Sequence, residues 1–298
     1  MGGLGLLTSG DTKIEGSRLA LGRFFGGLLQ VYRVIRAVIF NLLFLLILVA
    51  AIGPSFVGDP FKISPRDRLR PPSERFWFGT DQFGRDVFTR TVWGARVSLI
   101  VGLSVAAISS VLGLALGLLC GYFRRVDGFV MRIMDGVMAI PSILLAIALI
   151  TLTKPGLGIV IVAIVIPEVP RIVRVVRAVV LSIRAQPYVE SAIAGGTRSM
   201  RLLVRHVLPN TLAPLIVQAT FVCASAMLIE SGLSFLGAGV PPEVPSWGNI
   251  IAQGRTFFQI APWTILIPGG FLALTVLAVN LLGDGLRDRL DPRLARRL

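Results

Sequence analysis

The chain has 298 residues, of which 54% are hydrophobic and 15% are charged, and its mean hydropathy is +0.79. This composition excludes an ordinary soluble globule and indicates an integral membrane protein, most simply with one polytopic domain. The net charge of +14 would suggest a nucleic-acid partner in a soluble protein. In a membrane protein, basic residues instead orient the spans, so we expect the lipid bilayer as a partner and no nucleic acid.

Six segments are apolar over roughly the 20 helical residues that cross a hydrocarbon core of about 30 Å. They are residues 34–56, 97–121, 134–152, 156–166 extended toward 176, 212–233 and 265–282. The fourth is the least regular because Pro167, Glu168 and Pro170 interrupt it. The sequence therefore predicts an all-α integral membrane protein with six transmembrane helices.

The distribution of basic residues selects the orientation of these spans. With the N-terminus inside, the cytoplasmic segments hold 20 Lys and Arg residues and the external segments hold 10. The positive-inside rule favours this N-in, C-in arrangement in the plasma membrane. The apolar stretch 37–51 begins too late for a secretion signal and is longer than a typical signal core, so we expect an uncleaved anchor.

Three glycines, Gly113, Gly117 and Gly121, recur at four-residue spacing in the second span. Residues at this spacing share one helix face, and glycines there let another helix backbone approach closely. We expect this face to pack against a neighbouring helix.

The reactive side chains are few. His206 is the only histidine, and Cys120 and Cys223 both lie in apolar stretches, which favours free thiols over a disulfide. A histidine-based zinc cluster or a Ser-His-Asp triad has too few members. We expect no metal, no cofactor and no catalytic residue in this chain.

Two carboxylates fall within apolar segments, where an ionisable group is costly and is a functional candidate. For Glu230, near the expected outer end of its span, a structural hydrogen-bonding role and a place with Ser231 on a substrate path both remain open. Glu168 is expected to pair with Arg171 or Arg174.

A polar, basic island, residues 188–209, separates two apolar spans and predicts a cytoplasmic docking element. Residues 190–194 favour a helix, Gly195 and Gly196 interrupt it, and residues 199–206 predict a second helix that ends before Pro209.

The spacing within the island carries a resemblance. Glu190 and Ala192 are followed by Gly196, then nine residues, then His206, with Pro209 three positions later. This pattern resembles the EAA loop of permease subunits of bacterial ABC importers, the binding-protein-dependent transport inner membrane components. His206 resembles the dipeptide, oligopeptide and nickel branch. Segments 78–86, 241–249 and 280–292 resemble other stretches of that branch.

The resemblance implies a type I ABC importer permease fold and a set of partners. These are a homologous second permease subunit, two ATPase subunits and an external substrate-binding protein. No lysine follows a glycine in the sequence, so a phosphate-binding P-loop is absent and we expect ATP and Mg on the ATPase partners. The residues expected to contact an ATPase are Glu190, Ala192, Gly196, Arg201, Arg205, His206 and Pro209.

The resemblance also assigns roles to regions. Residues 1–94 would form a cytoplasmic tail, the first span and the start of an external loop; residues 95–284 the permease domain with a cytoplasmic coupling loop, 184–210; and residues 285–298 a cytoplasmic tail. The external loop around 76–96 is expected to form an interfacial helix that holds the first span, or to contact the binding protein.

The predicted function is that of a non-catalytic, multi-pass permease subunit of the bacterial inner membrane that imports short peptides. Nickel complexes and glutathione-like solutes are the alternative cargoes. A proton-coupled secondary transporter using Glu168 and Glu230 is an alternative of another class, and a membrane-embedded enzyme is a third.

Overall fold

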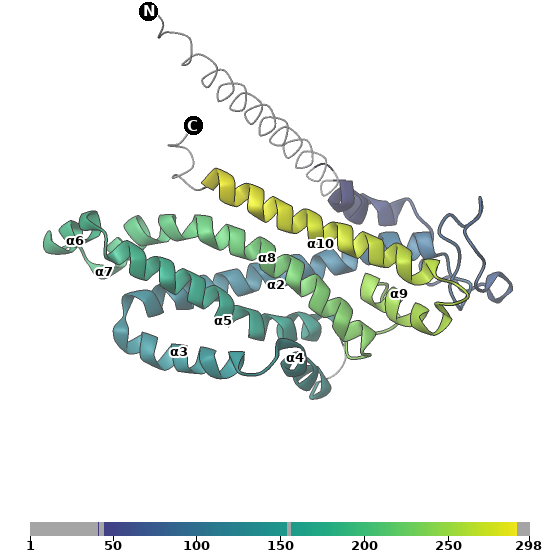
Figure 1. Cartoon of the computed structure of the whole chain (residues 1–298), viewed down its shortest axis with the longest axis horizontal. Helices are drawn as coiled ribbons and strands as arrows, with labels where there is room; N and C mark the ends of the chain where they lie inside the picture. The colour runs from purple at the N-terminus through teal and green to yellow at the C-terminus, as the bar shows by residue number, and fades with distance from the viewer. Residues whose placement is uncertain (1–40, 42–44, 154–155, 291–298) are drawn as a thin grey trace, which may run out of the picture. The chain divides into compact units, whose positions relative to one another are not determined.

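The structure is a computed structural model and describes residues 41, 45–153 and 156–290. The described residues from 45 onward belong to one compact unit. All their regular elements are helical, apart from an isolated bridge between Thr80 and Asp86 (Figure 1). The predicted all-α class is confirmed.

Three helices are long and apolar enough to cross a membrane. They are α2 (Val87–Tyr122), the helix that ends with α8 (Leu208–Phe235), and α10 (Trp263–Leu290). α2 begins earlier than the predicted span because the side chain of Asp86 accepts hydrogen bonds from the Phe88 and Thr89 backbone N–H groups, which caps the helix. Of the predicted first span, residues 34–40 and 42–44 lie outside the described residues, and Leu45–Ser55 is an apolar helix that ends in the short turn η1 (Gly53–Ser55).

The predicted span at 134–152 is wrong as one continuous helix. α3 (Arg124–Met138) ends near the start of that stretch, and α4 (Ser142–Thr151) continues at an angle of 87° to it. Pro141 explains the break, because a proline cannot donate a backbone hydrogen bond and its ring disfavours the helical conformation at Ile140. The described residues thus hold three candidate spans, or up to four if this bent pair crosses as one, and the count of six stays a prediction.

The predicted fourth span is one helix, α5 (Leu157–Arg184), which continues through Pro167 and Pro170. It is less uniformly apolar than α2, α8 and α10, because Glu168 and several arginines lie within it. It nevertheless packs along α2 and α8 (Figure 1).

The contact between α2 and α5 depends on the three predicted glycines. A Cβ atom at Gly113, Gly117 or Gly121 would lie 2.5–2.6 Å from side-chain atoms of α5. The side chains that occupy this space are Ile172, Val176 and Val180. Because both sets repeat every four residues, the branched side chains of α5 seat on the glycine face of α2.

The remaining elements are short. The segments η2 (Pro65–Asp67), α9 (Trp247–Gly254) and η4 (Arg255–Phe257) lie at the end of the bundle where α2 begins and α8 ends. α6 (Pro187–Ala194), α7 (Ser199–Leu202) and the π-helical turn η3 (Leu203–Val207) connect α5 to α8. The predicted division at 94–95 falls inside α2 and that at 284–285 inside α10; the roles of the three regions stay predictions.

Candidate functional site: the polar segment and the buried network

The polar segment, residues 184–210, begins with a helix whose start follows from its sequence. Pro187 occupies the first turn of α6, where its missing N–H costs nothing, and Glu190 lies near the positive end of the helix dipole. Val189 is the only residue of α6 that is buried. α6 is therefore anchored through one side chain and leaves the rest of its surface free of the chain's own core.

The end of α6 is a Schellman turn built on Gly196. The Gly196 N–H bonds to Ile193 O at 3.0 Å, and the Thr197 N–H bonds to Ala192 O at 3.0 Å. Gly196 has a φ of +77°, in the left-handed region that other L-residues enter only at a cost. The predicted glycine hinge between two helices is thus a specific turn in which Gly196, rather than Gly195, needs glycine.

The prediction that the second helix ends before Pro209 is wrong. α7, η3 and α8 form one helix from Ser199 to Phe235. In η3 the Leu208 N–H bonds to Leu203 O, five residues back, and the side-chain amide of Asn210 donates to His206 O at 2.7 Å. The π-helical turn and the asparagine supply the hydrogen bonds that a proline disturbs, so the helix passes Pro209 without stopping.

The side chains predicted to contact an ATPase are mostly turned away from the chain's own core. Exposed positions are Glu190, Gly196, Arg201, Arg205 and Pro209, whereas Ala192 and His206 are half-buried. The centres of the His206 and Tyr188 rings lie 6.2 Å apart. This contact joins η3, which leads into α8, to α6. The structure brings these residues into one segment, and their contact with another chain stays a prediction.

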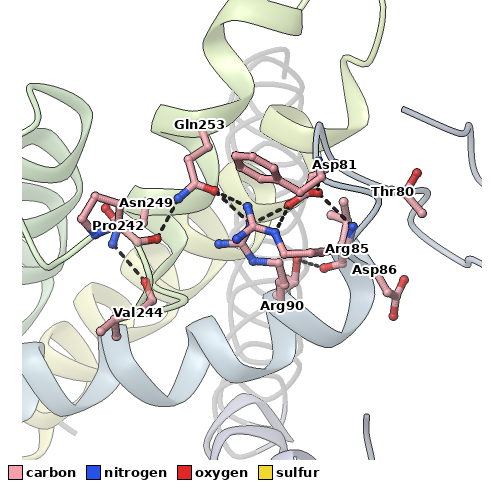
Figure 2. Close-up of polar contacts among 12 residues, drawn as sticks. Thr80, Asp81, Arg85, Asp86, Arg90, Pro242, Val244, Asn249 and Gln253 are labelled. Atoms are coloured by element: carbon pink, nitrogen blue, oxygen red, sulfur yellow. Dashed lines mark hydrogen bonds and ion pairs between the residues drawn. The ribbon is translucent and has the colours of Figure 1, made fainter. Parts of the chain in front are cut away.

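A second cluster of polar residues lies at the opposite end of α8 and is buried. This buried network consists of the buried residues Asp81, Arg85, Arg90 and Asn249 together with the half-buried Gln253 (Figure 2). Asp81 Oδ2 accepts from Arg85 Nε and from Arg90 Nη1, both at 2.7 Å. Gln253 Oε1 accepts from the same two guanidinium groups, at 2.7 and 3.0 Å. The start of α2 is thereby tied to α9.

The amide groups of the network hold the loop that precedes α9. Asn249 Nδ2 lies 2.8–3.1 Å from the carbonyl oxygens of Val240, Pro241 and Val244, and Gln253 Nε2 donates to Pro242 O at 2.8 Å (Figure 2). The loop therefore has its shape fixed by side chains as well as by prolines. Sequence reasoning missed Arg90, Asn249 and Gln253; a buried amide or guanidinium looks the same in sequence as an exposed one.

Glu230, the predicted hydrogen-bonding or substrate-path residue, is fully buried next to this network. Its Oε1 accepts from Ser234 Oγ at 2.9 Å and from Ser246 Oγ at 2.8 Å. Ser246 also caps α9 by accepting from the Asn249 N–H at 3.1 Å. This geometry fits the structural role, while Ser231 is half-buried and a place on the substrate path stays a prediction for both residues.

The loop before α2 is not the interfacial helix that was predicted. Residues 76–86 form turns, and Gly79 and Gly84 adopt φ values of +71° and +72°. Asp67 closes the adjoining turn, and the hydrogen bond from Ser64 Oγ (2.7 Å) together with Arg70 lowers the pKa of its carboxyl below the ordinary value. A lowered pKa means that this carboxylate stabilises the fold above its ordinary pKa and loses that effect as the pH falls.

Glu168 forms the predicted pair with Arg171, at 3.0 Å between Oε1 and Nη1. Glu168 is fully buried, whereas the Arg171 side chain is 45% exposed. Within residues 45–153 and 156–290, no group of three His, Cys, Asp or Glu side chains could hold a metal ion.

Comparison with known proteins now decides the family. The profile of the binding-protein-dependent transport system inner membrane components matches residues 113–296. The chain belongs to this family. It is 59% identical over 250 residues to a probable peptide ABC transporter permease protein of Sinorhizobium fredii, covering 84% of this chain and 86% of that one.

Two further relatives support this membership, and one solved structure shares the fold. A dipeptide transport system permease protein of Alkalihalophilus pseudofirmus is 44% identical, with 83% and 82% of the two chains covered. An oligopeptide transport system permease protein of Bacillus subtilis is 37% identical, with 85% and 83% covered. A chain of the inward-facing MetNI methionine ABC transporter has the same fold, with a TM-score of 0.55, 21% identity, and coverage of 68% and 96%.

The family and the apolar helices together place the protein in the inner membrane as a multi-pass permease component of an ABC importer. Its polar segment lies within the matched residues, while the whole loop that leads into α2 precedes them.

Proposed function

We propose that this permease imports short peptides as one of two permease subunits of an ATP-driven complex. The proposal rests on relatives at 37–59% identity whose names specify peptide, dipeptide or oligopeptide transport. An external binding protein would deliver the peptide, and two separate ATPase subunits would bind ATP and Mg. The chain itself would be non-catalytic, since it lacks a lysine preceded by glycine for a P-loop.

The proposed topology has six spans with both termini in the cytoplasm. The three long apolar helices, the bent pair α3 and α4, α5, and a first span ending near Ser55 supply the six. The excess of basic residues on the predicted inner segments supports the direction. The polar segment then faces the cytoplasm, and the buried network faces outward.

The observation that carries the proposed coupling is the exposed surface of the polar segment. Beside its exposed charges lie apolar side chains with large exposed fractions, 47% for Ile193 and 69% for Met200. A segment that mixes exposed apolar and charged groups suits a partner of matching shape. Because one helix runs from Ser199 to Phe235, movement of a docked ATPase would be transmitted along α8 into the membrane.

Two substitutions test the docking. Gly196→Asp places a side chain at a φ of +77°, and Glu190→Lys reverses an exposed charge. We expect both to abolish peptide uptake and to reduce copurification of the ATPase, while the chain still inserts. Glu243→Lys, the same charge reversal at an exposed position before α9, is the control and should retain both activities. Normal uptake and normal ATPase binding in the two variants would refute the assignment.

The energy source separates this proposal from a proton-coupled secondary transporter. Vesicles loaded with ATP should take up a labelled dipeptide in the presence of an uncoupler. Uptake that an uncoupler abolishes, and that proceeds without ATP, would support the secondary transporter. Competition by nickel complexes or glutathione in the same assay would point to the alternative cargoes.

A further inference from the structure

A cavity of about 300 Å³ opens between α5, α8 and α10. A volume of roughly 300 Å³ is at the lower end of the range for small-molecule sites. The polar residues that line it are Glu168, Arg171, Gln218, Ser225 and Asn280. The rest of the lining is mainly apolar, from α8. The cavity is therefore lined by both polar and apolar groups, and its polar groups come from three helices.

The polar groups are only partly used within the chain. Arg171 Nη1 donates to Glu168, and the described residues offer no partner to its other two guanidinium nitrogens. The side chains of Gln218 and Asn280 likewise have no hydrogen-bond partner in the described part of the chain. Glu168 itself is held from two sides, because Ser225 Oγ lies 3.5 Å from Oε1. The carboxylate is fixed, and the guanidinium retains free donors.

Glu168 and Arg171 lie in the middle of α5, away from both of its ends. Glu168 and Arg171 lie 11 and 14 residues from Leu157, the first residue of α5, which is about 16–21 Å at 1.5 Å per residue. Polar groups so far inside a membrane helix face other protein or a water-filled cavity.

We propose that this cavity is a solute-contacting part of the translocation path and that Arg171 binds the carboxylate of the peptide. The inference rests on the proposed function as a peptide permease. A guanidinium matches a carboxylate through two parallel N–H···O bonds, which a lysine cannot reproduce. Glu168 holds Arg171 in place and balances its charge when no peptide is bound.

Cysteine labelling of the assembled transporter tests the cavity. The native Cys120 and Cys223 are buried and are first replaced by alanine. Gln218→Cys lines the cavity, whereas Ile216→Cys is a control at a 44% exposed position on α8 that does not line it. A membrane-impermeant maleimide should label Gln218→Cys and not Ile216→Cys. An unreactive Gln218→Cys in a complex that still transports would overturn the proposal.

Protection from the maleimide tests the role of Arg171 without the external binding protein. A dipeptide with a free carboxylate should slow the labelling of Gln218→Cys, and its C-terminal amide should need a roughly tenfold higher concentration, the loss expected for one charge-assisted bond. Arg171→Gln should erase the difference and Arg171→Lys reduce it. Arg174→Gln, which removes an exposed ion pair with Asp135, should leave it intact.

The outcomes separate the two proposals. Equal protection by acid and amide before any substitution at position 171 would overturn the role of Arg171. Labelling of Gln218→Cys with no protection and no uptake of any peptide would refute the peptide substrate. The labelling would then still support the cavity as part of a path for another solute.

Discussion

The two ends of α8 both gather charged and polar side chains but use them in opposite ways. In the polar segment Arg201 and Arg205 are exposed, and no hydrogen bond within the described residues holds either side chain. In the buried network the Arg90 side chain is 1% exposed and shares Asp81 with Arg85. Charges that satisfy one another hold a chain together, and charges left outside are free to bind another chain.

The difference predicts separate consequences for stability and for function. A buried ion pair that loses one partner leaves an uncompensated charge, whereas a surface charge contributes little to stability. Substitutions in the buried network should therefore act mainly by lowering the stability of the folded protein. Substitutions in the polar segment should alter activity in a protein that remains folded.

The largest effect is expected for Asp81→Ala. It leaves the buried Arg90 and Arg85 without their carboxylate partner, and we expect the free energy of unfolding to fall by about 3–5 kcal/mol. Thermal unfolding in detergent should show a much lower Tm and a small yield of folded protein. The matched variant at the other end, Arg201→Ala, should change stability by no more than about 0.5 kcal/mol. Similar losses in both variants would break the comparison between the two ends.

Most of the fold could be predicted from the sequence because lipid imposes one strong rule. A long apolar run must be helical, so each of α2, α8 and α10 contains a predicted span, although α2 begins ten residues earlier and α10 ends eight residues later than predicted. The break between α3 and α4 was missed, since a proline in an apolar run can end a helix or be passed. Pro141 ends one, whereas Pro167 and Pro170 lie within α5.

The candidate site could be predicted only in part. Features that depend on neighbouring residues are visible in the sequence, whereas contacts between residues far apart in the chain are not. The turn at Gly196 depends on neighbouring residues and is visible in the sequence. The bond between Arg90 and Gln253 joins residues 163 positions apart, and no periodicity reveals it. Similarly, Glu230 looked like a lone membrane carboxylate until Ser246, from the loop before α9, completed its environment.

A smaller loss is expected for Ser246→Ala, which tests how the network continues into α8. The substitution removes the cap of α9 and one of the two hydroxyl groups that donate to Glu230. We expect the free energy of unfolding to fall by about 2 kcal/mol, since a lost helix cap costs roughly 0.5–2 kcal/mol and the buried Glu230 carboxylate loses a hydrogen-bond donor. Ser231→Ala, next to Glu230 on α8, is the control and should leave the free energy of unfolding nearly unchanged in chemical denaturation. A silent Ser246→Ala would show that Glu230 does not depend on it.

The smallest change in stability is expected at the turn of the polar segment, where Gly195 and Gly196 form a matched pair. Gly195 has a φ of −74° and can accept alanine, whereas Gly196 at +77° resists it by about 1 kcal/mol. Gly196→Ala should therefore lower the Tm slightly and impair uptake, Gly195→Ala should affect neither, and Gly196→Asn should recover part of the loss because asparagine tolerates this conformation. Uptake impaired equally by both alanine variants would mean that the surface of the turn matters to the partner, rather than the backbone angle that aims α6.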